Sequence, residues 1–310
     1  GLLWWCAHEQ LNLETPPYNW FMLERELGML DINRRPKPIL KEMKKFSDWL
    51  GTVDFELEAP VKDALILLTK EQDCWATAFM SFILGKQAGV TLDFLAPNLD
   101  IPDSAVYFMP SVHSGCPLYA RYYNQLLDKV YNGAVLYVSN GDAFFNKREE
   151  VFGASVISSE DTYDSGTFTF NGSVIPYERY CKVGIEPTTA QVLANDGNGK
   201  PIFTVNNFGK GKIYYLNFPL EDMLSRQNHA FDGGAYKIYE YVLKELLEKK
   251  TVRKLNSKVG VTENGSIATV INYSNEPVKT GLYLQNGKRI GHIFRGNPDY
   301  LEPCDGAVFE

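Results

Sequence analysis

The stretch Asp63-Ala64-Leu65-Ile66-Leu67-Leu68 decides the fold of most of this chain. Its five consecutive apolar residues have the length of one β-strand. The segment before it, residues 54–60, is acidic and irregular, so a domain boundary is expected close to residue 57. After it the chain alternates between strand-like and helix-like runs. Such alternation is typical of a parallel sheet with right-handed crossovers, and it predicts a doubly wound α/β layer.

The alternation continues to about residue 250 and predicts the elements of this layer. Helical spacing of apolar residues predicts helices at 75–87, 117–131 and 234–249. Short apolar runs predict strands at 90–95, 105–109, 134–138, 190–194, 201–206 and 213–217. The last two strands flank the turn Gly209-Lys210-Gly211 and are expected near one edge of the sheet. Between residues 153 and 185 the pattern becomes short and polar, which predicts an insertion with a hairpin around 167–172.

Beyond residue 251 the helical pattern disappears and only short strands are predicted. They are expected at 259–262, 267–273, 280–284, 289–294 and 306–309. The pairs Asn264-Gly265 and Asn286-Gly287 lie between strands and are strong hairpin signals. This part of the chain is therefore predicted to be a small β-sandwich.

The first 56 residues have the pattern of one strand followed by helices. The run Leu2 to Ala7 is apolar and aromatic without alternation, which suits a strand buried on both faces. Asn19, after Pro16-Pro17, can cap a helix, and a second helix is predicted from about Pro38 to Gly51. The first of these helices would carry Phe21, Leu23, Leu27 and Leu30. Strand, loop and helices together resemble one βα unit.

Composition excludes several classes of protein. The formal net charge is −7, and Lys and Arg are scattered, so no nucleic acid partner is expected. The apolar runs are far shorter than the roughly 20 residues that span a bilayer, so no membrane association is expected. The five cysteines are widely spaced and are expected to be reduced and mostly buried. The chain starts at Gly1 without a leader pattern, which we interpret as a processed end or a boundary. An upstream secretion signal stays an alternative, and the location is left open, with the cytoplasm slightly favoured.

No cofactor or metal site is predicted. The four histidines, His8, His113, His229 and His292, show no paired spacing typical of metal ligands. The loop 69–73, where an α/β sheet would bind a ligand, lacks the glycines that cradle a phosphate. Flavin and nucleotide binding are therefore not expected.

Three segments in order resemble a known architecture. Residues 1–10, Gly-Leu-Leu-Trp-Trp-Cys-Ala-His-Glu-Gln, with Glu24-Arg-Glu-Leu-Gly28 and Arg35-Pro-Lys-Pro38, look like the end of the (β/α)8 barrel in clan A glycoside hydrolases. Gln191-Val-Leu-Ala194, Gly199-Lys-Pro201 and Phe208-Gly-Lys-Gly-Lys-Ile-Tyr-Tyr-Leu216 are similar to the middle domain of family 42 β-galactosidases. A terminal β-sandwich completes that domain order.

The resemblance implies three domains. Residues 1–56 would be the last βα unit of a (β/α)8 TIM barrel, and residues 57–250 a flavodoxin-like, glutamine-amidotransferase-like α/β domain. Residues 251–310 would be the C-terminal β-sandwich. The family's middle domain is called its trimerisation domain, which implies a homo-oligomer.

The resemblance also implies a function. Clan A enzymes hydrolyse glycosidic bonds with two carboxylates that follow barrel strands four and seven. If Leu2 to Ala7 is strand eight, both carboxylates lie upstream of Gly1, and this chain alone is not expected to hydrolyse anything. No catalytic residue is therefore assigned within the chain. The chain would complete the active site of a hydrolase of β-linked sugars, whose substrate is a carbohydrate.

Barrel enzymes build their sites at the C-terminal ends of strands, so Trp5, His8 and Glu9 are the candidate sugar-binding residues. A Trp ring stacks on the C–H face of a sugar, and His and Glu bond to hydroxyl groups. The alternative is a core position for both tryptophans, Trp4 and Trp5, with His8 and Glu9 in a solvated loop. The rival function is a non-catalytic carbohydrate-binding or scaffold protein.

Overall fold

The computed structural model describes residues 4–10, 14–17, 19–20, 26–285 and 290–310. The chain divides into two compact units, Gly1–Glu56 and Leu57–Glu310. The predicted further division of the second unit near residue 250 stays a prediction.

The first unit contains helix α2, Pro38–Leu50, as the sequence predicts. Pro38 lies in its first turn, where the missing N–H costs no helical hydrogen bond. The predicted buried strand is wrong over residues 4–7, which form no strand, and Trp4 and Trp5 are both exposed. A strand needs ladder partners, and the described residues give this segment only an isolated parallel bridge between His8 and Leu30. Most of the helix predicted after Asn19 lies outside the described residues.

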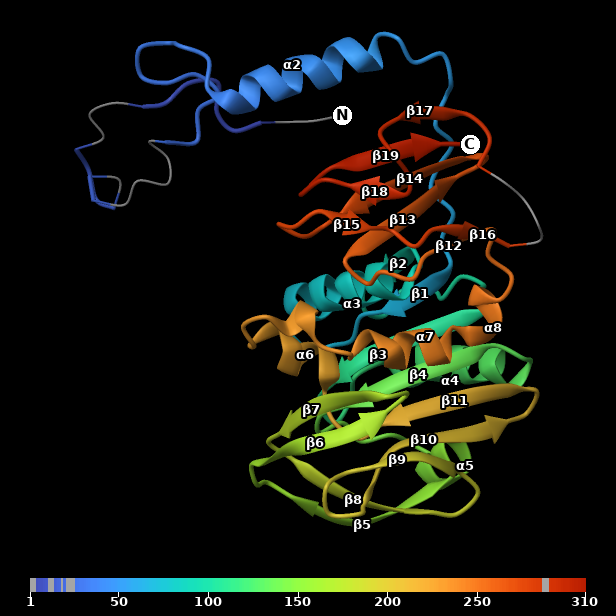
Figure 1. Ribbon diagram of the computed structural model, residues 1–310. Helices are drawn as coiled ribbons and strands as arrows, with labels where there is room; N and C mark the ends of the chain where they lie inside the picture. The colour runs from blue at the N-terminus through green and yellow to red at the C-terminus, as the bar shows by residue number, and fades with distance from the viewer. Residues whose placement is uncertain (1–3, 11–13, 18, 21–25, 286–289) are drawn as a thin grey trace. The chain divides into compact units, whose positions relative to one another are not determined.

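A central sheet organises the second unit (Figure 1). Its strand order is β2-β1-β3-β4-β11-β10-β9, parallel from β2 to β11, with β10 antiparallel to both of its neighbours. The strands are β1 Ala64–Leu67, β2 Leu92–Leu95, β3 Val106–Val112, β4 Val135–Asn140, β9 Gln191–Asn195, β10 Pro201–Phe208 and β11 Gly211–Leu216. The alternating pattern thus predicted the parallel part correctly, and the last strand pair lies toward one edge as expected.

Helices cover both faces of this sheet. On one face Ile66 and Phe108 pack against α3, α6 and α7, and on the other Leu65 and Tyr107 pack against α4 and α5. The helices are α3 Cys74–Ala88, α4 Ala120–Tyr131, α5 Arg148–Phe152, α6 Leu220–Ser225, α7 Tyr236–Val242 and α8 Lys244–Leu247. Alternate residues of each parallel strand therefore enter different cores, which requires the uninterrupted apolar runs seen in the sequence.

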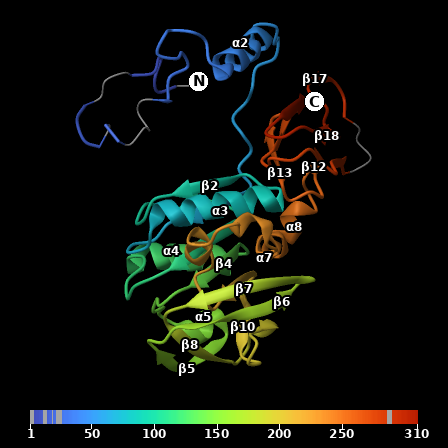
Figure 2. The same ribbon diagram turned by 60° about the vertical axis from the view of Figure 1, so that its left-hand side comes forward.

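The predicted insertion is a pair of hairpin-like sheets between β4 and β9. Strand β5 pairs with β8, and β6 pairs with β7, all antiparallel. Their bounds are β5 Ala154–Glu160, β6 Asp164–Phe170, β7 Ser173–Arg179 and β8 Lys182–Pro187. Figure 2 shows them gathered at the end of the second unit opposite the C-terminal strands.

Small antiparallel sheets form the C-terminal part. A four-stranded sheet has the order β13-β14-β19-β17, and β12–β16 and β15–β18 form two further pairs. The strands are β12 Val252–Arg253, β13 Val259–Asn264, β14 Ile267–Asn272, β15 Val278–Lys279, β16 Tyr283–Leu284, β17 Ile293–Arg295, β18 Tyr300–Leu301 and β19 Gly306–Phe309. Gly265, at a φ of 64°, makes the predicted β13–β14 turn. The second turn signal, Asn286-Gly287, lies outside the described residues.

Buried lysines join these strands to the α/β layer. Lys250 Nζ lies 2.9 Å from both Asp63 carboxylate oxygens and 2.6 Å from Glu263 Oε2. Lys86 donates to the Val261 carbonyl at 3.1 Å. Burial lowers the pKa of Lys86 to about 8. The ion pairs and hydrogen bonds fix β13 against the start of β1 and the end of α3.

All five cysteines are unpaired. Cys116 and Cys304 are exposed and the others are half-buried, so the expectation of mostly buried thiols is wrong. Both exposed cysteines lie in connections between strands or helices, where the backbone runs over the surface.

Among the helices of the described residues, none has the length and apolar character needed to span a bilayer.

Candidate functional site

The predicted sugar-binding residues lie in a segment that runs beside residues 28–30. The Glu9 amide donates to the Leu30 carbonyl at 2.9 Å, and the Leu30 amide donates to the Ala7 carbonyl at 3.1 Å. Gly28 permits this approach, because a Cβ atom there would lie 2.1 Å from the Glu9 nitrogen. The two stretches thus hold the backbone of the three candidates in place.

The three candidates differ in their surroundings. Glu9 is half-buried, and its Oε1 accepts a hydrogen bond from Lys37 Nζ at 2.6 Å. His8 and Trp5 are exposed, with 68% of Trp5 accessible. Trp4, the neighbour of Trp5, donates from its indole nitrogen to the Leu27 carbonyl at 3.0 Å. The segment therefore leaves Trp5 and His8 exposed and Glu9 half-buried, and the role of the three residues in sugar binding stays a prediction.

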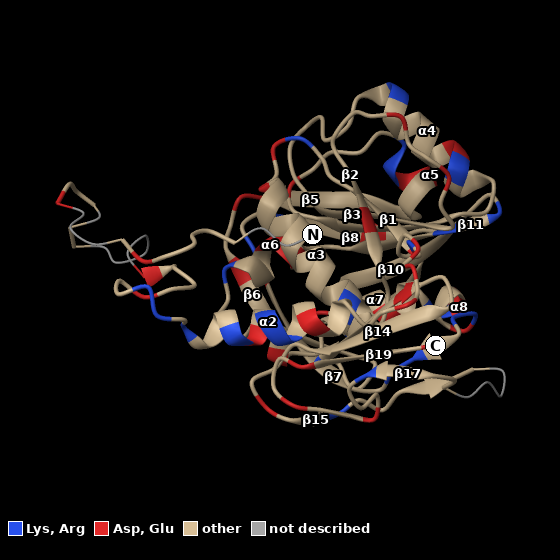
Figure 3. Cartoon of the chain, turned by 90° about the horizontal axis from the view of Figure 1, so that it is seen from above, with Lys and Arg blue, Asp and Glu red and all other residues tan. Residues whose placement is uncertain are grey.

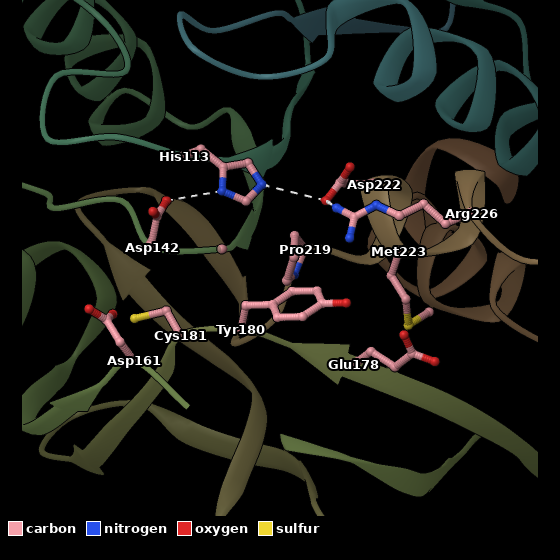
Figure 4. Close-up of a pocket in the computed structure, with 11 residues that line it drawn as sticks. His113, Asp142, Asp161, Glu178, Tyr180, Cys181, Pro219, Asp222, Met223 and Arg226 are labelled. Carbon is pink, nitrogen blue, oxygen red and sulfur yellow. Dashed lines mark hydrogen bonds and ion pairs between the residues drawn. The ribbon is translucent and has the colours of Figure 1, made fainter. Parts of the chain in front are cut away.

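A pocket of about 250 Å³ opens at the carboxyl ends of the parallel strands of the second unit. His113 follows β3, Asp142 follows β4, and Asp222 lies on α6, just after β11. The insertion supplies the opposite wall, with Tyr180 and Cys181 in the turn between β7 and β8 (Figure 4). Ligands of open α/β sheets bind at this edge.

His113 lies between two carboxylates. Its Nδ1 is 3.0 Å from Asp142 Oδ1, and its Nε2 is 3.7 Å from Asp222 Oδ2 (Figure 4). The second distance is too long for a hydrogen bond, so it is a contact between charges. Interaction with Asp222 raises the pKa of His113, burial opposes the shift, and the charge of Asp142 adds to it.

Asp222 has the opposite shift. Burial alone would raise the pKa of its carboxyl, but His113 and the ion pair with Arg226 together lower it. Both shifts favour an imidazolium held between two carboxylates.

The backbone around His113 has two local requirements. Ser111 has a φ of 45°, in the left-handed region, where the pairing of β3 with β4 shifts register. Gly141 lies against the imidazole ring, since a Cβ atom there would come within 2.2 Å of His113 Cε1. The left-handed conformation of Ser111 in β3 and the lack of a side chain at Gly141 together make room for the imidazole ring of His113.

A buried polar cluster lies behind the pocket. It consists of Ser111, Tyr137, Ser139, Glu221 and Tyr239, and we call it the Glu221 cluster. Glu221 is fully buried, and its carboxylate accepts hydrogen bonds from the other four hydroxyl groups. The Ser111 hydroxyl also accepts from the backbone amide of Asp222 at 2.9 Å. The cluster thereby fixes the start of α6, and with it the Asp222 side chain.

The sequence pattern did not lead to a prediction of this pocket. The signal was present, since His113 directly follows β3 and Asp142 lies two residues after the end of β4. The loop 69–73, considered above as a ligand-binding loop, is occupied by its own contacts: the Gln72 side chain accepts from the Thr69 amide at 2.6 Å. Among the described residues, no group of His, Cys, Asp and Glu is arranged to hold a metal ion.

Known proteins resemble this chain in structure but not in sequence. No protein-family model and no curated protein sequence matches the chain. Solved structures do match. A β-galactosidase from the haloarchaeon Halorubrum lacusprofundi matches 93% of this chain with a TM-score of 0.67 at 15% identity. A family 42 β-galactosidase from G. stearothermophilus matches 91% with a TM-score of 0.61 at 17% identity.

An exo-β-1,4-mannosidase from an Opitutaceae bacterium matches 77% of the chain with a TM-score of 0.59 at 17% identity. In all three cases the match covers 45% of the solved chain. The protein therefore has a glycoside hydrolase-like fold, a mixed α/β layer with small antiparallel sheets, and it spans less than half the length of these enzymes.

Proposed function

We propose that this chain is the C-terminal portion of a glycoside hydrolase that acts on β-linked sugars. One observation carries the proposal: nearly the whole chain shares its fold with β-galactosidases while covering 45% of their length. In this proposal a general acid and a second carboxylate lie upstream of Gly1. They would cleave the glycosidic bond, about 5 Å apart in a retaining enzyme or farther apart in an inverting one.

The α/β layer would be the flavodoxin-like middle domain of such an enzyme. The order β2-β1-β3-β4 of parallel strands, with helices on both faces, supports this proposal. The C-terminal strands would be its β-sandwich. Assembly into a homo-oligomer through the middle domain belongs to the same proposal.

Trp5, His8 and Glu9 would form part of the sugar subsite of the completed barrel. The exposed Trp5 ring offers an aromatic face, and the contact with Lys37 keeps Glu9 oriented. With Lys37 as partner, Glu9 would serve as a hydrogen-bond acceptor for a hydroxyl group.

Hydrolysis of aryl β-galactosides and β-mannosides tests the proposal. The protein encoded by the whole reading frame is expected to turn these substrates over, and the 310-residue chain is expected to be inactive. In the longer protein, Trp5→Ala should raise KM more than it lowers kcat. Turnover by the 310-residue chain, or binding without turnover by the longer protein, would refute the proposal. The latter result would favour a non-catalytic carbohydrate-binding protein.

A further inference from the structure

We propose that the pocket between His113 and Tyr180 is a second sugar-binding site, which takes one neutral pyranose ring and contains no residue of the Trp5 segment. Its volume of about 250 Å³ lies just below the range of about 300–1,000 Å³ that drug-sized ligands occupy, so it suits a single small ring. Carbohydrate recognition needs an aromatic face for the C–H surface of the ring and charged or amide groups for its hydroxyls. The pocket contains both.

Tyr180 provides the aromatic face. It lies in the turn between β7 and β8, is 63% exposed, and lines the pocket. The Tyr163 ring lies 5.3 Å away at a tilt of 51°, and the Arg226 guanidinium lies 5.8 Å from the Tyr180 ring centre. These two neighbours hold the ring in position at the surface. An exposed aromatic side chain that is braced in this way loses little further entropy when a ligand stacks on it.

The hydroxyl-binding groups surround this ring. Figure 4 shows Asp161 and Cys181 on one side of Tyr180 and Glu178 on the other, with His113 beyond Pro219. Within the part of the chain that the structure describes, the hydrogen bond that Glu178 accepts is a long one, 3.5 Å from Gln227 Nε2. A carboxylate can accept about four hydrogen bonds, so Glu178 retains capacity for vicinal hydroxyl groups.

The charge of the lining selects a neutral ligand. Four carboxylates, Asp142, Asp161, Glu178 and Asp222, outnumber the basic groups of the lining, which are Arg226 and His113. The negative balance repels phosphates and sugar acids. Figure 3 shows Lys and Arg interspersed with Asp and Glu along the ribbon of the second unit.

An organic ammonium ion would match the negative charge, but two of the four carboxylates already have partners within the pocket. Asp142 and Asp222, the two carboxylates nearest His113, are already neutralised by His113 and Arg226. The remaining acceptors, Asp161 and Glu178, lie beside Tyr180, where they suit the hydroxyl groups of a stacked sugar.

Saturation-transfer NMR on the 310-residue chain tests the site. The probes are methyl β-D-galactopyranoside and methyl β-D-mannopyranoside, with glucosamine and glucuronate as the cationic and anionic comparisons. We expect transfer to at least one neutral glycoside with a Kd on the order of 1 mM, weaker transfer to glucosamine and none to glucuronate. Tyr180→Ala should weaken binding at least about tenfold, and Tyr180→Phe should retain it.

Two control variants distinguish this pocket from the other aromatic surfaces of the chain. Tyr300→Ala removes an exposed tyrosine of the C-terminal strands and should change nothing. Trp75→Ala removes an exposed tryptophan of α3 and should also leave binding intact, whereas loss of binding in that variant would assign the sugar to the surface of α3 and overturn the inference. Absence of transfer to both neutral glycosides, tighter binding of glucosamine, or full binding by Tyr180→Ala would each overturn it. The inference and the proposed function are tested by different experiments. Hydrolysis is measured on the longer protein, whereas sugar binding to the pocket is measured on the 310-residue chain, so either can fail without the other.

Discussion

Replacing Glu221 by glutamine tests how the Glu221 cluster holds the pocket wall. The carboxylate accepts from Ser111 Oγ at 2.9 Å and Tyr239 OH at 2.9 Å, and from Tyr137 OH at 3.2 Å and the Ser139 hydroxyl. Burial raises the pKa of Glu221, although the hydrogen bonds from Ser139, Ser111 and Tyr239 oppose the shift. Glutamine keeps the shape of the glutamate side chain. Its NH₂ group, however, replaces one carboxylate oxygen, and each of these oxygens accepts two of the four hydrogen bonds.

The expected change in stability follows from these contacts. Loss of two hydrogen bonds to a charged acceptor, at about 1.5–3 kcal/mol each, costs about 3–6 kcal/mol. Removing the buried carboxylate charge offsets part of this loss, because that charge also carries a desolvation cost. We therefore expect Glu221→Gln to lower the free energy of unfolding at pH 7 by less than this full cost, on the order of 2 kcal/mol.

Urea denaturation followed by tryptophan fluorescence measures this change, and its pH dependence checks the sign. Because the folded-state pKa of Glu221 is raised, its contribution to stability is full below the unfolded pKa and is lost as the pH rises through the folded pKa. The difference between wild type and Glu221→Gln should therefore be larger near pH 4 than at pH 7.

The matched control is Glu245→Gln, whose exposed carboxylate pairs with Lys212 at 3.0 Å. It should change stability by less than about 0.5 kcal/mol. A Glu221→Gln protein as stable as wild type at pH 7, or more stable, would refute the reasoning, since the four hydroxyl groups would then need no charged acceptor.

Two further predictions concern charges at other places in the second unit. Lys250→Met should lower the free energy of unfolding by about 3–5 kcal/mol, because the buried carboxylates of Asp63 and Glu263 lose the ammonium group that pairs with them. Urea denaturation measures this change. A loss of stability below about 1 kcal/mol would contradict the prediction. Asp142→Asn should lower the pKa of His113 in an NMR titration, because the Asp142 carboxylate stabilises the protonated ring. The contribution of this contact to the stability of the fold is full below the ordinary pKa of His113. It is lost as the pH rises through the raised pKa of the folded protein. An unchanged titration would show that Asp142 does not act on His113.

Local patterns in the sequence predicted the regular elements well. The helix from about Pro38 to Gly51 and the strand at residues 64–68 were placed to within about one residue, because a terminal proline or an uninterrupted apolar run marks the element. The hairpin at Asn264-Gly265 was equally clear, since few residues other than Asn and Gly adopt that turn. Helices α5 and α6 were missed because each is shorter than two turns and shows no period.

The segment around Trp5 shows why burial could not be predicted there. An apolar, aromatic run is typical of a buried strand, yet burial depends on neighbouring strands that the local sequence does not encode. The described residues place only the 28–30 stretch beside it, and Trp5 stays exposed. Gly28, which allows that contact, had no local signal beyond being a glycine.

The whole pocket could not be predicted from the sequence. Its walls come from distant parts of the chain, which meet only in the folded protein. His113 and Asp142 meet because parallel strands end at one edge of a sheet, which the sequence pattern does imply. Tyr180 reaches them only because the insertion folds back across that edge, and hairpin signals set the pairing within the insertion but not its docking.

It follows that the sheet and α6 supply His113 with its two neighbouring carboxylates, and the insertion supplies Tyr180 with Asp161 and Glu178 beside it. The sheet half is constrained by the Glu221 cluster and by Gly141, which leave His113 and Asp222 little freedom. The insertion half ends in an exposed turn, where substitutions cost little stability. Ligand preference at this site should therefore change by substitution around Tyr180 while the imidazolium between its two carboxylates stays fixed.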